Sequence, residues 1–246
     1  MISLTEKYLN TLSEDILTLS LEGRGLTSLP DLSRFKNLKE LYLCDNLLVS
    51  LPNNLPQGIE ILFLSGNKLS SLPDLIRFTN LRELWVSVNK LSFMPTLPES
   101  LERLWCSNNE ITYFTNLPPN LIDLNCHKNK LKSLPNLPQN LYSLYCFNNY
   151  LTSIPNLPEK MLYIYYCGNP ICNILDITNN NLIKLKKNII IVNNFIHIYY
   201  SLPFKKPFMK WLWKSREKKI MEKYHPKYLL ENLEENTDLD EFLNNW

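Results

Sequence analysis

Six cysteines are the residues of this chain most able to do chemistry, and three of them recur at a fixed interval. Cys106, Cys126 and Cys146 are each 20 residues apart. Three aligned thiolates would suit a soft metal ion, whereas a buried cysteine also serves as a small apolar side chain. No CxxC spacing and no histidine at the same position completes a metal site. We therefore interpret the three cysteines as core residues and expect no metal and no cofactor.

The remaining reactive residues form no catalytic pattern. His127, His197 and His225 fall in three different sequence contexts, and no GxSxG, HExxH or glycine-rich phosphate loop occurs. Cys44 is followed by Asp45, but His127, its candidate base, lies far along the chain. We predict that the protein is not an enzyme and has no small-molecule substrate.

The interval between the cysteines belongs to a longer period. Seven asparagines spaced 21, 22, 20, 20, 20 and 20 residues apart sit in the pattern LxLxxNxLxxLP: Asn46, Asn67, Asn89, Asn109, Asn129, Asn149 and Asn169. An eighth, degenerate repeat begins near Leu19 and has Arg24 in the asparagine position. Such a period is typical of a leucine-rich repeat. The sequence predicts an α/β repeat solenoid of eight repeats over residues 17–175.

Each position in the repeat has a predicted role. Alternate residues of a short strand point to opposite sides, so the two leucines of LxL should enter the core, with cysteine replacing the second one in three repeats. The asparagine follows where the chain bends out of the strand. Its amide can satisfy backbone groups that the bend leaves unpaired. Stacked repeats should then form a continuous asparagine ladder.

The side opposite the strands is predicted from the prolines. The 20-residue repeats contain Leu-Pro-x-Leu-Pro, and two close prolines favour an extended or polyproline-like chain. The two 22-residue repeats lack the second proline and carry Asp31 and Asp74 instead. We expect a short turn of helix there, capped by the aspartate.

These LPxLPxxLxxLxLxxNxL repeats resemble the 20-residue repeats of bacterial type III effectors. The resemblance implies a curved, non-catalytic recognition surface. Because an extended convex side packs nearly as closely as the strands, we expect a shallow leucine-rich-repeat arc with a parallel sheet on its concave side. In that family the surface is sometimes joined to a ubiquitin-ligase domain, whose Cys-x-Asp nucleophile motif is absent here. The segment from Trp211 to Leu230 resembles tails of proteins from giant DNA viruses of amoebae, which implies a viral protein that meets a host.

The predicted concave face carries a column of aromatic residues. One outward position is aromatic in six of the eight repeats, as Tyr42, Phe63, Trp85, Trp105, Tyr145 and Tyr165, with Ser20 and Asn125 in the other two. Tyrosine and tryptophan are enriched at binding hot spots. The adjoining column holds Glu83, Arg103 and Asp123, which can set the register of a partner. We predict a protein or peptide partner here, a host protein being one candidate; alternatively, the rings only stabilise the sheet.

The two ends are predicted to be helical. Residues 1–16 should form a capping helix that begins at the capping box from Ser3 to Glu6. Residues 176–246 should form a helical cap in which a helix from Leu182 to Leu202 packs on the open end of the solenoid. A basic segment, Lys205–Lys227, precedes an acidic one, Glu231–Glu241. We expect these two to pair as a hairpin.

Two other functions remain open for this tail. It could recruit a cellular machine such as a ubiquitin ligase, which would make the protein a substrate adaptor. Its basic aromatic residues could instead contact a membrane or nucleic acid, but a net charge of +2 gives little general attraction to either. The sequence shows no signal peptide and no apolar stretch of the ~20 residues that a transmembrane helix needs. We expect an intracellular protein of the host cytoplasm.

Overall fold

The computed structural model describes residues 4–175 and 181–201 and divides into two units, residues 1–169 and 170–246. The first unit begins with the helix α1 (Leu4–Leu9) and continues with eight strands of three residues. The strands are β1 (Thr18–Ser20), β2 (Glu40–Tyr42), β3 (Ile61–Phe63), β4 (Glu83–Trp85), β5 (Arg103–Trp105), β6 (Asp123–Asn125), β7 (Ser143–Tyr145) and β8 (Tyr163–Tyr165).

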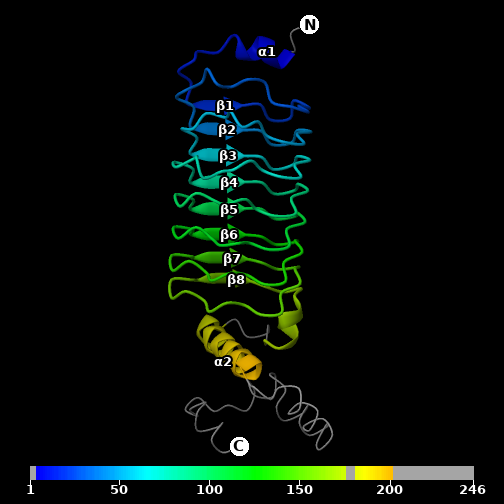
Figure 1. The fold of residues 1–246 in the computed structure, drawn as a ribbon, viewed down its shortest axis with the longest axis vertical. Helices are drawn as coiled ribbons and strands as arrows, with labels where there is room; N and C mark the ends of the chain where they lie inside the picture. The colour runs from blue at the N-terminus through cyan, green and yellow to red at the C-terminus, as the bar shows by residue number, and fades with distance from the viewer. Residues whose placement is uncertain (1–3, 176–180, 202–246) are drawn as a thin grey trace, which may run out of the picture. The chain divides into compact units, whose positions relative to one another are not determined.

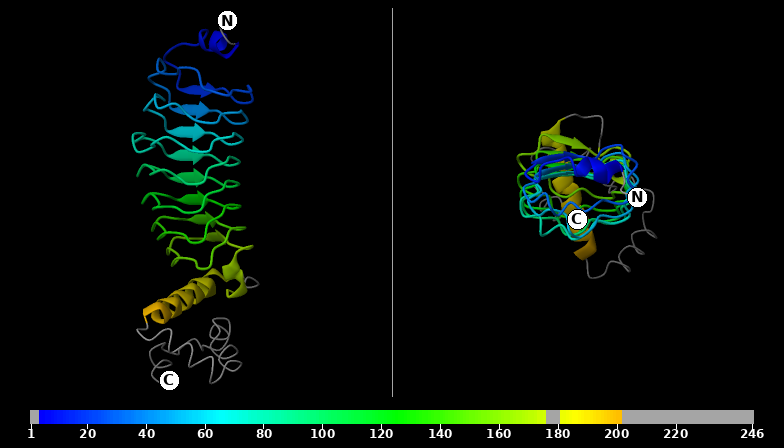
Figure 2. Two further views of the ribbon diagram at one scale, coloured as in Figure 1. Left: turned by 45° about the vertical axis from the view of Figure 1, so that its right-hand side comes forward. Right: turned by 90° about the horizontal axis from the view of Figure 1, so that it is seen from above.

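All eight strands form one parallel sheet in chain order, as Figure 1 shows. Equivalent residues pair between neighbours, so that Leu41 lies beside Leu62 and Leu62 beside Leu84. Viewed along the stack, the successive coils of this unit largely superimpose (Figure 2). The predicted repeat solenoid with a parallel sheet is confirmed.

The core lies inside the coils. The central residue of β2 to β7 and the residue two positions later are fully buried in every repeat. Cys106, Cys126 and Cys146 take the second of these positions and are 0 % exposed, as predicted for core residues. Full burial of one leucine contributes roughly 1.5–3 kcal/mol. A single coil has too few such residues to fold alone, so stability comes from stacking neighbours.

The side opposite the strands lacks the helix predicted for the two longer repeats. The N–H of Phe35 donates to the carbonyl of Leu32 (3.1 Å), and that of Leu38 to Phe35 (3.2 Å). All three side chains are buried, so the chain must bring every third residue inward. Bonds between residues i and i−3 have that spacing, whereas an α-helix has 3.6 residues per turn. Consecutive turns therefore replace the α-helix.

The two aspartates bind the backbone within these turns. Asp31 Oδ1 accepts from the N–H of Ser33, and Asp74 Oδ1 from that of Ile76, each at 3.0 Å. An aspartate that accepts from the N–H two residues on forms a local turn. Both residues thus act as turn formers and not as helix caps.

The second unit contains a short 3₁₀ helix, η1 (Pro170–Asn173), and the predicted long helix, α2 (Leu182–Ser201). Asn181 Oδ1 accepts from the N–H of Lys184 (3.1 Å), which caps the start of α2. Packing of α2 on the solenoid stays a prediction. Ser3, the basic segment and the acidic segment lie outside the described residues. Within residues 4–175 and 181–201, no helix combines the length and apolar character needed to cross a membrane.

Candidate partner-binding face

The asparagines join each coil to the one before it. Asn109 Nδ2 donates to the carbonyl of Cys106 in its own repeat (3.1 Å) and to that of Val86 in the preceding repeat (2.9 Å). Its Oδ1 accepts from the N–H of Leu91, also in the preceding repeat (3.0 Å). The same three contacts recur at all the remaining ladder asparagines, from Asn46 to Asn169.

Most carbonyls in this ladder accept from two asparagines at once. Cys106 O receives Nδ2 of Asn109 at 3.1 Å and Nδ2 of Asn129 at 3.0 Å. The N–H that bonds to the asparagine Oδ1 has no such second partner, because Leu91 N–H donates only to Asn109 Oδ1. The N–H of Leu91 therefore depends on the asparagine of the next repeat for its acceptor. This ladder fixes the bend that ends every strand.

The residue before each asparagine has a left-handed backbone. Gly66 and Gly168 adopt it without steric cost, but Val88 also does, with φ 57°. A β-branched residue in this region is strained. Val88 is 56 % exposed, so its side chain recovers little of that cost by burial.

Outward-pointing side chains of β1 to β8 make up what we call the strand face. Its aromatic column forms two stacks of rings. The first runs from Tyr42 through Phe63 and Trp85 to Trp105, with centroids 4.7, 4.9 and 3.9 Å apart. The second pairs Tyr145 with Tyr165 at 5.0 Å. The rings share their faces and keep part of each edge in solvent, since none of the six is buried.

A row of paired charges runs beside the rings. Arg103 Nη1 contacts Glu83 Oε1 at 2.6 Å, and Arg103 Nε contacts Asp123 Oδ2 at 3.4 Å. Asp123 also accepts from the hydroxyl of Ser143. In two strands the carboxylate and the ring bond each other: Tyr42 Oη donates to Glu40 and Trp85 Nε1 to Glu83, both at 3.2 Å.

The aromatic column is interrupted at β6, where Asn125 replaces a ring. His127 Nδ1 lies 2.6 Å from Asn125 Oδ1, which requires the hydrogen of the neutral imidazole to be on Nδ1. The His127 ring stacks on Phe147 at 4.2 Å. Burial, and then the charge of Lys128, lower the pKa of His127 below its ordinary value. The imidazole is thus held neutral beside the break in the stack.

The buried thiols are expected to be unreactive. Burial raises the pKa of Cys106 and Cys126 well above that of a free thiol, and no disulfide forms between the described cysteines. Cys44 is half-buried and Cys167 is exposed, in the outward positions expected from the sequence. In the described part of the chain, no three His, Cys, Asp or Glu residues are grouped to hold a metal ion.

The sequence located the columns of this face but not all their contacts. Proximity of Glu83, Arg103 and Asp123 followed from the repeat period. The double pairing of Arg103 did not, because side-chain reach depends on rotamers. The sequence presents His127 only as a candidate base and does not predict its contact with Asn125. The available signal was that Asn125 and His127 are two residues apart, a spacing that points both side chains to the same side of the strand.

A parallel-sheet solenoid whose coils are joined by an asparagine ladder is the architecture of a leucine-rich-repeat protein. No protein-family model and no curated protein sequence matches the chain. Solved structures do. The leucine-rich-repeat domain of a Shigella effector is 31 % identical with a TM-score of 0.55, over 68 % of this chain and 74 % of that one. The chain therefore belongs to the leucine-rich-repeat proteins.

Two further solved structures share this fold. YopM, a leucine-rich effector protein of Yersinia pestis, is 32 % identical with a TM-score of 0.58, over 62 % of this chain and 49 % of that one. The chain thus spans about half the length of YopM. InlJ of Listeria monocytogenes, whose functional domain includes a cysteine ladder, is 20 % identical with a TM-score of 0.50. The match covers 62 % of this chain and 40 % of the InlJ chain, and it supports the fold alone.

Proposed function

We propose that this chain is a non-catalytic interaction module that binds a protein or peptide partner on its strand face. The observation that carries the proposal is the four-ring stack from Tyr42 to Trp105, which runs beside the row formed by Glu83, Arg103 and Asp123. Rigid rings give large contact area and lose little side-chain entropy on binding.

The stacked arrangement determines what a partner would contact. Each inner ring has both faces against its neighbours, so a partner meets ring edges, which carry the positive part of the aromatic quadrupole. Carbonyl oxygens and the faces of other rings suit such edges. The stack is also held in place before binding, which lowers the cost of ordering the face.

The charge row adds direction to this surface. Arg103 is fixed between two carboxylates, so the sequence of charges along the sheet is negative, positive, negative. A partner with the complementary order gains in only one alignment, and a shifted partner meets like charges. The row therefore favours one register of a bound segment.

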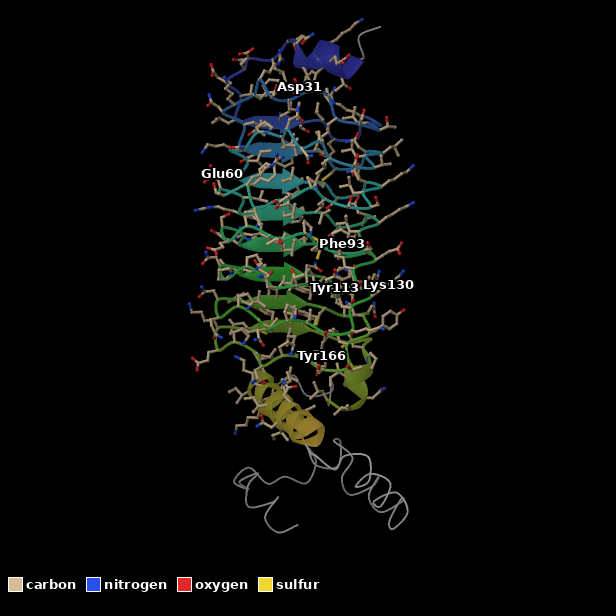
Figure 3. The ribbon with its side chains drawn as sticks, viewed as in Figure 1. Asp31, Glu60, Phe93, Tyr113, Lys130 and Tyr166 are labelled. Carbon is tan, nitrogen blue, oxygen red and sulfur yellow. The ribbon has the colours of Figure 1, made fainter. Side chains whose placement is uncertain are left out.

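The test is affinity capture from a lysate of an amoebal host, because the tail resembles proteins of viruses that infect such cells. The variant Phe63→Ser/Trp85→Ser/Trp105→Ser removes three rings of the stack. The matched control is Phe93→Ser/Tyr113→Ser, since these rings are 41 % and 53 % exposed but lie on the flank opposite Glu60, away from the strand face (Figure 3). Circular dichroism checks that both variants fold.

We expect the parent and the control to capture a partner and the three-ring variant to lose it. Equal capture by a folded three-ring variant would show that the rings only stabilise the sheet. Loss of capture in the control as well would move the contact to the flank where the chain leaves the strands. Either of these results refutes the strand face as the binding site.

A further inference from the structure

The break in the aromatic column lies between two rings that each have one face without a ring partner. Trp105 stacks on Trp85, and Tyr145 stacks on Tyr165. Among the described residues, no ring contact joins Trp105 to Tyr145 across Asn125. Because the three residues pair in register on β5, β6 and β7, the two rings are two strand spacings apart, roughly 9.6 Å.

This separation fits one more ring. A planar group midway between them would lie about 4.8 Å from each, and the existing stacked pairs have centroid distances of 4.7, 4.9 and 5.0 Å. Asn125 does not fill the position with a ring of its own. Its amide oxygen is bonded to His127, which draws the short side chain toward the neighbouring column.

The same strand supplies a hydrogen-bond acceptor for such a ring. In β2 and β4, the carboxylate at the first position accepts from the ring at the third: Glu40 from Tyr42, and Glu83 from Trp85. β6 keeps the carboxylate, Asp123, but has no ring to donate to it. Asp123 binds one Arg103 nitrogen at 3.4 Å and one hydroxyl, out of about four lone-pair sites. It retains capacity for another donor.

We infer that the position over Asn125 is a recognition site for a tyrosine or tryptophan side chain of the partner. The inserted ring stacks between Trp105 and Tyr145, and its O–H or N–H donates to Asp123. The partner thereby completes the aromatic column. This inference rests on the proposed function and names the chemical group that the strand face selects.

The experiment titrates the full-length protein with N-acetyltryptophanamide and follows the ring resonances of Trp105 and Tyr145 by NMR. We expect both to shift together and to saturate. N-acetylphenylalaninamide, which lacks the ring donor, should bind about five-fold more weakly. N-acetylargininamide tests whether a planar cation is preferred instead.

Two variants control this titration. Asn125→Tyr fills the position from within, so it should abolish the shifts and raise Tm by joining the two stacks. Ser20→Tyr adds a ring to the same column next to Tyr42, at the far end, and should leave the shifts unchanged. Normal circular dichroism confirms that both variants fold.

Four results would overturn the inference: no saturable shift at Trp105 and Tyr145, shifts that persist in Asn125→Tyr, equal binding of the phenylalanine amide, or stronger binding of the arginine amide. The first of these would leave the proposed function intact if the three-ring variant still loses its partner. Binding of the tryptophan amide without any partner loss in that variant would contradict both the proposed function and the inference that the partner supplies the ring, because the variant lacks Trp105.

Discussion

Replacement of Asn109 by leucine tests the asparagine ladder at one buried position. The change removes the bonds that Nδ2 donates to Val86 O and Cys106 O, a longer contact of Nδ2 with Ser107 O (3.3 Å), and the bond that Oδ1 accepts from Leu91 N–H. Val86 O and Cys106 O each keep the donor of a neighbouring asparagine, so each of these two losses costs about 0.5–1.5 kcal/mol. Leu91 N–H loses its acceptor, which costs about 1–3 kcal/mol. We expect the free energy of unfolding to fall by about 2–6 kcal/mol.

Asn109→Asp keeps the hydrogen-bond acceptor of the side chain and removes its donors, so it tests the two roles separately. A carboxylate still accepts from Leu91 N–H but turns its other oxygen toward two carbonyls, so the pKa of the new carboxyl should rise above its unfolded value of about 3.9. Below that value the carboxyl is protonated in both states and can donate one bond. As pH rises from there through the raised folded pKa, stability is lost. The penalty is thus smallest in acid and complete above the folded pKa.

Urea denaturation followed by circular dichroism measures the global change, and amide hydrogen exchange of Leu91 reports the local one. Both substitutions should be measured against the parent at each pH. Asn109→Leu should show no recovery in acid relative to the parent, whereas Asn109→Asp should. A loss below about 1 kcal/mol for leucine, or a pH-independent penalty for aspartate, would refute this account of the ladder.

Three further predictions concern the rest of the first unit. Val88→Asn should raise the free energy of unfolding by about 1 kcal/mol in urea titrations, because asparagine tolerates the left-handed backbone that strains valine. Phe78→Ala should lower it by about 3–5 kcal/mol, since the ring is 0 % exposed inside a longer repeat. Mass spectrometry after thiol labelling at about pH 8 should find Cys167 modified first. Cys44, whose thiol pKa is raised by burial, should follow slowly, and Cys106 should react only in denaturant.

The main features of the solenoid could be predicted from its period. The inward positions of Leu62 and Leu64 recur in every repeat, mostly as leucine or cysteine, so strand position, inward direction and parallel pairing follow together. The turns at Asp31 and Asp74 could not be predicted in the same way. Local propensity allows either a turn of helix or consecutive turns there, and the choice depends on which side chains the interior accepts.

The strand face could likewise be predicted only in part. Strand periodicity alone predicts that Trp85 and Trp105 lie next to each other. It could not show that the rings stack, that Arg103 bridges two carboxylates, or that Asn125 leans toward His127. Those contacts depend on side-chain rotamers and on neighbours in other repeats. The strain at Val88 was also hidden, because glycine, aspartate, asparagine and lysine occupy the equivalent position elsewhere.

The one-sided reach of the asparagines has a consequence for synthesis on the ribosome. In each coil, the N–H two residues after the asparagine position finds its acceptor in the asparagine of the following coil, as Leu91 does in Asn109. A growing chain therefore always ends in an incomplete coil, and completion lags emergence by one period of about 20 residues. A chain cut after Leu91 and before Asn109 would expose that same unfinished edge, with an amide ready to pair with any passing carbonyl. We therefore expect the leading coil of a nascent chain to be the part most prone to pair with other chains.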